Sequence, residues 1–262
     1  MGELPAVVPR AAAGDRPFRL ARRPPAPELA DVVLHFWSVE WSLPPGTQHV
    51  QAVISDPCGH VSVDDHGAWL QGVVTRRFEI RLEGAGRVVS AHLRPAALSA
   101  LTDLAPARIT DSRLPLFEAM PDAPGLVKVT AAESQAAGMD ALEDWFRRVG
   151  PTRRRGAELV DEAVDMVVAR TDLTRVDMLA AELGVTVRTL QRRFDRHLGV
   201  GPKWVLRRCR IQDALGVIEE GGEVDWAALA AELGFADQSH FTNAFTALVG
   251  SPPGEYTRRP QR

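Results

Sequence analysis

Side chains that can hydrogen-bond to the edges of DNA bases recur at helical spacing between residues 188 and 196. If this segment is a helix, Leu190 and Phe194 share its apolar face. The opposite side then presents Arg188, Gln191 and Arg192, with Arg193 and Arg196 more lateral. Arginine suits guanine and glutamine suits adenine in the major groove, so this face is predicted to read bases. Lys203, which lies beyond the helix, is predicted to contact the DNA backbone only.

A second segment, from residue 237 to residue 245, has a similar layout but little charge. Phe241 and Phe245 occupy one side of a possible helix, and the remaining side is polar. The residues predicted to face DNA there are Gln238, Ser239, His240, Thr242 and Asn243. Phosphate contacts supply much of the affinity for DNA, so this uncharged segment is expected to bind weakly by itself.

The hexapeptide Leu-Ala-Ala-Glu-Leu-Gly precedes both polar segments, at residues 179–184 and again at 229–234. Its glycine ends one helix, and Thr186 or Asp237 can cap the next. A helix, a glycine turn and a second helix form the unit that places its second helix in the major groove. We therefore predict two helix-turn-helix units, at about 176–197 and 226–248, joined by a long helix after Pro202.

This region resembles the DNA-binding domain of the AraC/XylS family of transcription regulators. Its first half matches the family pattern with the run LAAELGVTVRTLQRRFDRHLGVGPKWVLRRCRIQDAL. Its second half matches at Gly234, Phe235, Asp237, Ser239, Phe241, Phe245, Gly250, Pro253 and Tyr256. The resemblance implies two recognition helices about 34 Å apart on one face of DNA. It also implies base contacts by Arg188, Gln191, Arg192, Ser239, Thr242 and Asn243, with Gln238 and His240 beside them.

The sequence departs from this family at three positions of its second half. Family members place basic residues at the positions of Asn243 and Thr246 and an arginine at that of Thr257, and here all three are uncharged. The resemblance therefore predicts an unequal pair of units, in which the first supplies most of the DNA affinity.

The part that precedes these units is predicted to be β-rich. Residues 1 to about 30 show no periodicity and are expected to form a loosely packed entry. Short apolar runs broken by turn residues fill 31–115 and predict a small barrel or curled sheet. Helical patterns follow at 95–104 and 131–149. The expected fold class is α+β, with a barrel-like sensor domain over 1–150 and an all-α domain over 151–262. The first 150 residues resemble, more distantly, the sensor domains fused to AraC-type domains.

Two groups of apolar side chains in the first domain each allow two interpretations. Phe36, Trp37 and Trp41 can line a ligand pocket or fill a core, and a core is favoured. In the helical stretch 131–149, one face carries Leu142, Trp145, Phe146 and Val149. This face must be covered by its own domain or by a second copy of the chain, and nothing in the sequence separates the two. We expect a homodimer through this helix.

The segment 56–66 holds six possible metal ligands, namely Asp56, Cys58, His60, Asp64, Asp65 and His66. Cysteine, histidine and carboxylate are metal ligands, but the spacing fits no strong motif. Asp-Pro and Asp-Asp-His-Gly are also good turn sequences. We therefore expect turns and predict neither metal nor cofactor; a metal sensor using Cys58, His60 and His66 remains an alternative.

Composition and missing motifs narrow the function. The net charge is −3 and only two cysteines are present, which suits a reducing cytoplasm and excludes a multi-cysteine zinc site. No signal peptide, membrane span or catalytic motif is recognisable, so we expect a non-enzymatic regulator. Its expected partners are double-stranded DNA, a small-molecule effector and, for an activator, RNA polymerase. The alternative is a regulator whose first domain is a protein-interaction module.

Overall fold

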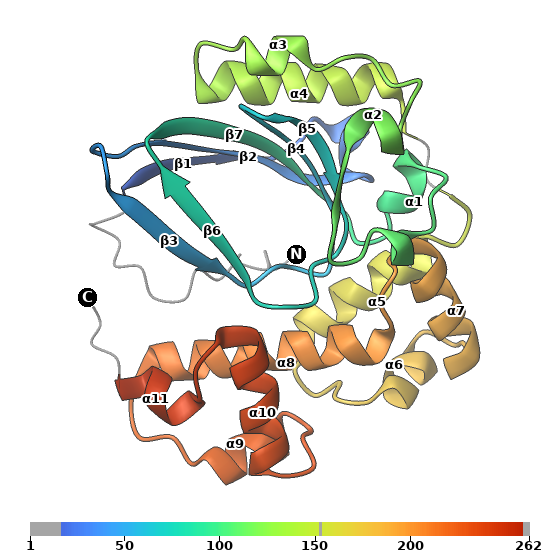
Figure 1. Cartoon of the computed structure of the whole chain (residues 1–262). Helices are drawn as coiled ribbons and strands as arrows, with labels where there is room; N and C mark the ends of the chain where they lie inside the picture. The colour runs from blue at the N-terminus through green and yellow to red at the C-terminus, as the bar shows by residue number, and fades with distance from the viewer. Residues whose placement is uncertain (1–16, 152–153, 259–262) are drawn as a thin grey trace.

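The computed structural model describes residues 17–151 and 154–258. A β-rich part with peripheral helices is followed by a part that is helical throughout, which confirms the predicted α+β class (Figure 1). Residues 1–16 of the predicted entry segment lie outside the described residues. Among the residues described, no helix has both the length and the apolar character that crossing a membrane requires.

The strands form two separate antiparallel sheets. The larger one has the strand order β1-β2-β7-β4-β5-β8, and the smaller one pairs β3 with β6. Their bounds are β1 Phe18–Arg23, β2 Val33–Ser42, β3 Gln48–Val53, β4 His60–Asp64, β5 Gly67–Gln71, β6 Phe78–Glu83, β7 Ala85–Leu93 and β8 Arg113–Pro115. The expected barrel is therefore not closed in the described chain, because β1 and β8 are the two edges of the larger sheet.

Strand β1 corrects the prediction of a loosely packed entry. It pairs with β2 from Phe18, opposite Trp41, to Arg23, opposite Phe36. As an edge strand it alternates only weakly between half-buried and exposed side chains, so its apolar signal is faint. The sequence does not predict this strand, because pairing with β2, rather than its own composition, holds it in place.

The two faces of the larger sheet differ in chemistry. One face packs its apolar side chains beneath α3 (Val127–Thr130) and α4 (Gln135–Val149), which lie across it in Figure 1. The alternation of strands sends Val61, Val89 and Ala91 into this core. The opposite face carries the paired His35 and His92 together with other polar side chains. Short elements complete this part: η1 Pro27–Leu29, α1 Leu98–Leu101, η2 Pro106–Arg108 and α2 Leu116–Ala119.

Helix α4 covers the apolar face of the sheet in its own domain. The prediction that its apolar side forms a dimer interface is therefore wrong. Leu142, Trp145 and Phe146 are fully buried, and Val149 packs partly buried against the same core. The indole N–H of Trp145 donates to the carbonyl of Pro124 at 2.6 Å. The physical reason is that the sheet has an apolar face of its own, which this helix covers.

The helical part consists of two small cores on either side of one long helix. In Figure 1, α8 runs beneath the sheets, with α5 to α7 at one end and α9 to α11 at the other. The bounds are α5 Glu158–Ala169, α6 Val176–Glu182, α7 Val187–His197, α8 Pro202–Glu220, α9 Trp226–Glu232, α10 Gln238–Val249 and α11 Pro253–Arg258. The β-rich part contributes to both cores, because Val73 and Ala96 are buried in the first and Ile54 in the second.

We predict that Phe146→Ala lowers the free energy of unfolding by about 3–5 kcal/mol, since it leaves a cavity beneath α4. Denaturant unfolding of the whole chain measures the effect. Phe117→Ala is the matched control because Phe117 is 71% exposed, and it is expected to change stability by no more than about 0.5 kcal/mol. Equal losses from the two variants would contradict the placement of α4.

Candidate nucleic-acid interface

The turn before α7 sets the direction of that helix. Gly184 adopts a left-handed φ of 64°, which glycine tolerates at a helix end. The hydroxyl of Thr186 then caps α7 by accepting from the backbone N–H of Thr189 at 3.1 Å. Leu190 and Phe194 are fully buried, so they fix the rotation of the helix. Its N-terminal turn and polar side are left facing outward.

The outward side of α7 carries most of the predicted base-reading residues. Arg188, Gln191, Arg192 and Arg196 are exposed. Lys203 is also exposed, in the first turn of α8. Arg193 differs: it is half-buried and donates to the carbonyl of Arg155 at 3.5 Å. That contact turns Arg193 toward the segment before α5 and away from the other polar side chains.

Helix α10 repeats the arrangement in the second unit. The carboxylate of Asp237 caps it by accepting from the backbone N–H of His240 at 2.7 Å, and Gly234 has a φ of 75° in the preceding turn. Phe241 and Phe245 are fully buried. The exposed polar residues are Gln238, Ser239, His240 and Asn243, whereas Thr242 is half-buried. The exposed side of α10 therefore offers hydrogen-bonding groups without a lysine or arginine.

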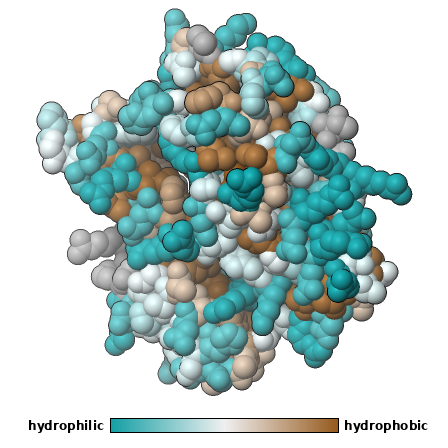
Figure 2. All heavy atoms as spheres, turned by 45° about the vertical axis from the view of Figure 1, so that its right-hand side comes forward, coloured by the Kyte–Doolittle hydropathy of each residue, from teal (hydrophilic) through white to brown (hydrophobic). Residues whose placement is uncertain are grey.

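Two arginines of the basic segment 188–210 are buried and do not face solvent. Both Arg208 and Arg210, on α8, are 2% exposed. Arg210 donates to the carbonyl of Arg170 at 3.1 Å and pairs with Asp213 at 3.1 Å. It therefore joins α5 to α8 inside the protein, and the exposed positive charge of this segment comes from α7, Lys203 and Arg207. In the view of Figure 2, hydrophilic side chains cover much of the surface, and hydrophobic ones gather in separate patches.

Sequence comparison agrees with this geometry. Residues 179–259 match the model of a helix-turn-helix domain, and residues 21–115 match a domain of unknown function, DUF6597. An AraC-like transcription regulator of Streptomyces lividans is 35% identical over 82 residues, which is 31% of this chain and 27% of that protein. The C-terminal part of the chain is thus similar to the helix-turn-helix regions of AraC-like transcription regulators.

Other similar proteins share less of the sequence. The HTH-type transcriptional regulator GlxA of Rhizobium meliloti (strain 1021) is 29% identical over 128 residues, or 49% of this chain and 37% of GlxA. The chain thus spans only about a quarter to a third of the length of these curated relatives. A crystal structure of ToxT from Vibrio cholerae is 12% identical, covering 92% of this chain and 98% of ToxT with a TM-score of 0.40.

The β-rich part holds both units of the AraC-type domain. On the first unit, Ser99 Oγ lies 2.8 Å from His197 Nδ1, and Thr110 donates to the carbonyl of Gly199 at 3.3 Å. On the second, Arg208 donates to the carbonyls of Ile54 and Ser55 and pairs with Asp56 at 3.2 Å. The two units are therefore both supported by the β-rich part.

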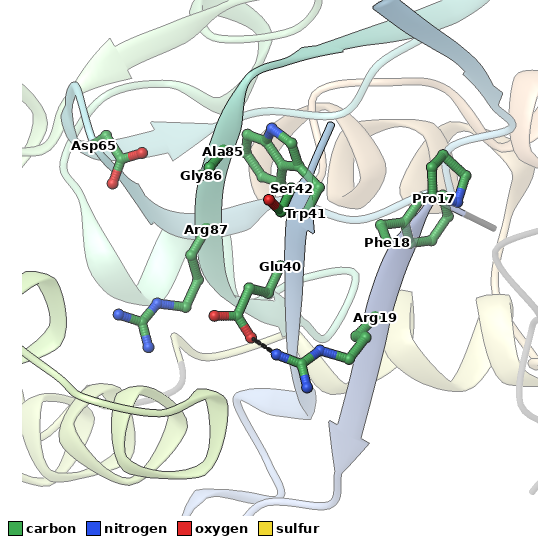
Figure 3. Close-up of a pocket in the computed structure, with 10 residues that line it drawn as sticks. All are labelled: Pro17, Phe18, Arg19, Glu40, Trp41, Ser42, Asp65, Ala85, Gly86 and Arg87. Atoms are coloured by element: carbon green, nitrogen blue, oxygen red, sulfur yellow. Dashed lines mark hydrogen bonds and ion pairs between the residues drawn. The ribbon is translucent and has the colours of Figure 1, made fainter. Parts of the chain in front are cut away.

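The three aromatic residues predicted to line a pocket lie in different places. Phe36 is fully buried and packs edge-on against Phe146 with 6.0 Å between ring centroids, so its pocket role is wrong. Trp37 is half-buried on the opposite side of β2. Trp41 lines a surface pocket of about 530 Å³ with Phe18 and Glu40, as Figure 3 shows. Strand alternation places Phe36 on one face of β2 and both Trp37 and Trp41 on the other, where they are four residues apart along the strand.

The segment 56–66 divides into a turn and a buried cluster. Asp64 accepts from the backbone N–H of His66 at 2.9 Å and from the indole of Trp69 at 3.1 Å, which makes residues 64–67 a hairpin turn. Cys58 and His60 lie instead beside His92, which the sequence analysis did not select. His92 pairs across strands with both His35 and His60. Only this register reveals the cluster.

Burial controls the ionisation of this cluster. It raises the pKa of the Cys58 thiol well above its usual range. It also lowers the pKa of His60 to about 4 and that of His92 well below its usual value. Burial raises the pKa of Asp56 to about 6, although the Arg208 guanidinium opposes the rise. At neutral pH the two imidazoles are therefore uncharged, and Asp56 is the acidic partner of Arg208.

We predict that Arg208→Ala lowers the free energy of unfolding by about 3–5 kcal/mol, since it leaves Asp56 buried without its counter-charge. Arg207→Ala is the matched control, because the neighbouring arginine is exposed. That control is expected to stay within about 0.5 kcal/mol of the parent. Chemical denaturation of the full chain compares them, and an unaffected Arg208→Ala protein would show that this ion pair does not hold the two parts together.

Proposed function

We propose that the chain is a sequence-specific DNA-binding transcription regulator. The observation that carries the proposal is the pair of capped helices, α7 and α10, whose exposed sides hold hydrogen-bonding side chains. Arg188, Gln191 and Arg192 project from α7 and suit the edges of guanine and adenine. Arg196 and Lys203 are exposed nearby and supply positive charge for phosphate oxygens.

Helix α10 takes the second groove in this proposal. Gln238, Ser239, His240 and Asn243 are exposed on it and can donate and accept hydrogen bonds. Thr242 is only half-buried and contributes at the edge. At about 1.5 Å per residue, the 19 residues of α8 make a rod of about 28 Å between the units. That length suits two helices in successive turns of one DNA face.

The β-rich part is proposed as the sensor for a small molecule. The pocket beside Trp41 supports this, since about 530 Å³ lies within the range of small-ligand sites. Its wall combines the apolar Phe18 and Trp41 with the ion pair of Arg19 and Glu40, whose atoms are 3.0 Å apart. A ligand with an apolar body and a polar end fits such a lining.

The cellular compartment, the assembly state and the protein partner of the regulator are proposed on more general grounds. Cys58 and Cys209 are both free thiols, which supports action in a reducing cytoplasm. We propose a homodimer through a surface other than α4, because two-fold dimers are the commonest assemblies of this kind. RNA polymerase is a further partner if the regulator activates transcription.

Base reading by α7 is tested with Arg192→Ala. The variant is expected to lose about 1–3 kcal/mol of affinity and to relax specificity at one base pair. Lys203→Ala is the comparison: it is expected to weaken all sequences alike and to reduce the salt slope by about one. Fluorescence anisotropy on a DNA site selected from a random pool, and on single-base variants of it, measures both. A uniform loss with Arg192→Ala would remove its assignment as a base reader.

The inequality of the two units is tested by a matched pair of amide side chains. Gln191→Ala on α7 is expected to reduce affinity for the selected site far more than Asn243→Ala on α10. The reason is that the contacts around Gln191 are reinforced by neighbouring arginines, whereas α10 has no exposed positive charge. The same binding assay compares the variants, and equal losses would show that both helices contribute alike.

A further inference from the structure

Three potential metal ligands from separate positions in the chain lie close together on the polar face of the larger sheet. This is the face opposite the one that α3 and α4 cover. One ligand atom from each of Cys58, His60 and His92 lies within 4.8 Å of the other two. Cys58 Sγ is 2.6 Å from His92 Nε2, and the rings of His60 and His92 meet edge-on with centroids 4.5 Å apart. Strand register produces this meeting, because His60 on β4 is opposite His92 on β7.

Two features next to these three side chains bear on cation binding. His92 Nε2 lies 3.4 Å from a carboxylate oxygen of Asp56, so this acidic group, which also pairs with Arg208, adjoins the ligands. His60 Nδ1 is buried and has no hydrogen-bond partner among the described residues. An unsatisfied buried nitrogen is costly, and coordination to a metal ion would offset that cost. A neutral imidazole has a lone pair that a metal ion can accept.

We propose that Cys58, His60 and His92 bind one divalent zinc ion. Thiolate and imidazole are the ligands that zinc prefers, and three protein ligands leave the fourth tetrahedral position for water. Binding releases the Cys58 thiol proton to solvent and forms a bond from Sγ to the metal, so the metal replaces a proton. Tetrahedral bonds set Sγ and Nε2 about 3.5 Å apart, so these two atoms separate slightly from their present contact.

The site is joined directly to the AraC-type domain by the loop 54–59. The backbone N–H of Cys58 donates to the carbonyl of Asp56 at 2.8 Å, and Asp56 pairs with Arg208 on α8. Ile54, at the start of the same loop, is buried in the core of the second unit. Metal binding therefore acts on the residues that hold α8. This consequence rests on the proposed function: zinc is expected to change affinity for the selected DNA by about fivefold or more.

Metal binding is tested on the whole chain after treatment with a chelator. Isothermal titration with Zn²⁺, and elemental analysis after gel filtration, are expected to give one ion per chain. Co²⁺ in place of zinc is expected to show a thiolate-to-metal charge-transfer band, which reports the Cys58 bond without any mutation. Absence of stoichiometric metal, or a cobalt spectrum without that band, would overturn the site.

Matched variants assign the ligands. Cys58→Ser and His92→Gln are expected to weaken Zn²⁺ binding at least tenfold, as measured by competition with a chelating dye. Cys209→Ser, which changes the other buried cysteine, and His66→Gln, in the exposed hairpin turn, should bind like the parent. Circular dichroism establishes that each variant is folded; should Cys58→Ser unfold, His60→Asn and the cobalt spectrum of the parent decide. Parent-like affinity in folded ligand variants would contradict the assignment.

The effect of zinc on DNA binding is measured separately, so that failure of this coupling can be distinguished from failure of the metal site. Affinity for the selected site is compared with zinc and with chelator, for the parent and for His92→Gln. A fivefold change in the parent that is lost in His92→Gln supports the coupling. Stoichiometric zinc with unchanged DNA affinity overturns the coupling and leaves the site standing. No DNA binding in either condition overturns the proposed function, while the metal titration still decides the site.

Discussion

The contact between Arg208 and Asp56 is the interaction on which the arrangement of the chain depends. Both side chains are almost completely buried, and neither charge is tolerated there without the other. The same guanidinium donates to two backbone carbonyls of the loop 54–59, so it fixes a segment of the β-rich part against α8. Because α8 joins the two helix-turn-helix units, this anchor sets the orientation of the units relative to the sheets together with the contacts at His197 and Gly199.

The contacts between the β-rich part and the helical part limit how the two helix-turn-helix units can be controlled. The first unit is held at His197 and Gly199, near the C-terminal end of α7, and the second through Arg208 and Ile54. Neither contact covers Arg188, Gln191 or Arg192, so the exposed side of α7 stays accessible while its support is fixed. A signal received in the β-rich part would therefore act by shifting the units relative to each other, without exposing or covering α7.

The sequence predicts those elements whose structure is determined by residues close together in the chain. The caps at Thr186 and Asp237, and the buried Phe194 and Phe245, lie within a few residues of the helices they define. Their periodicity therefore predicts those helices directly. The similarity to AraC-like regulators rests on the same local pattern.

Long-range pairing explains what the sequence could not supply. Trp145 and Phe146 were equally compatible with a core and with a dimer, because only the sheet beneath α4 decides between the two. The Cys58–His92 contact joins residues 34 positions apart and depends on the register of β4 and β7. Likewise, the sequence alone suggests that Arg208 is another exposed basic residue of the segment 188–210. Only the position of the loop 54–59, which buries this side chain, shows otherwise.

We propose that α7 and α10, held on one support, read DNA together. Hydroxyl-radical footprinting of the full chain on DNA selected from a random pool tests this proposal. Two protected segments are expected, about one helical turn apart on the same face of the duplex. The segment covered by α7 should be protected more strongly. A single protected segment, or two on opposite faces, would contradict it.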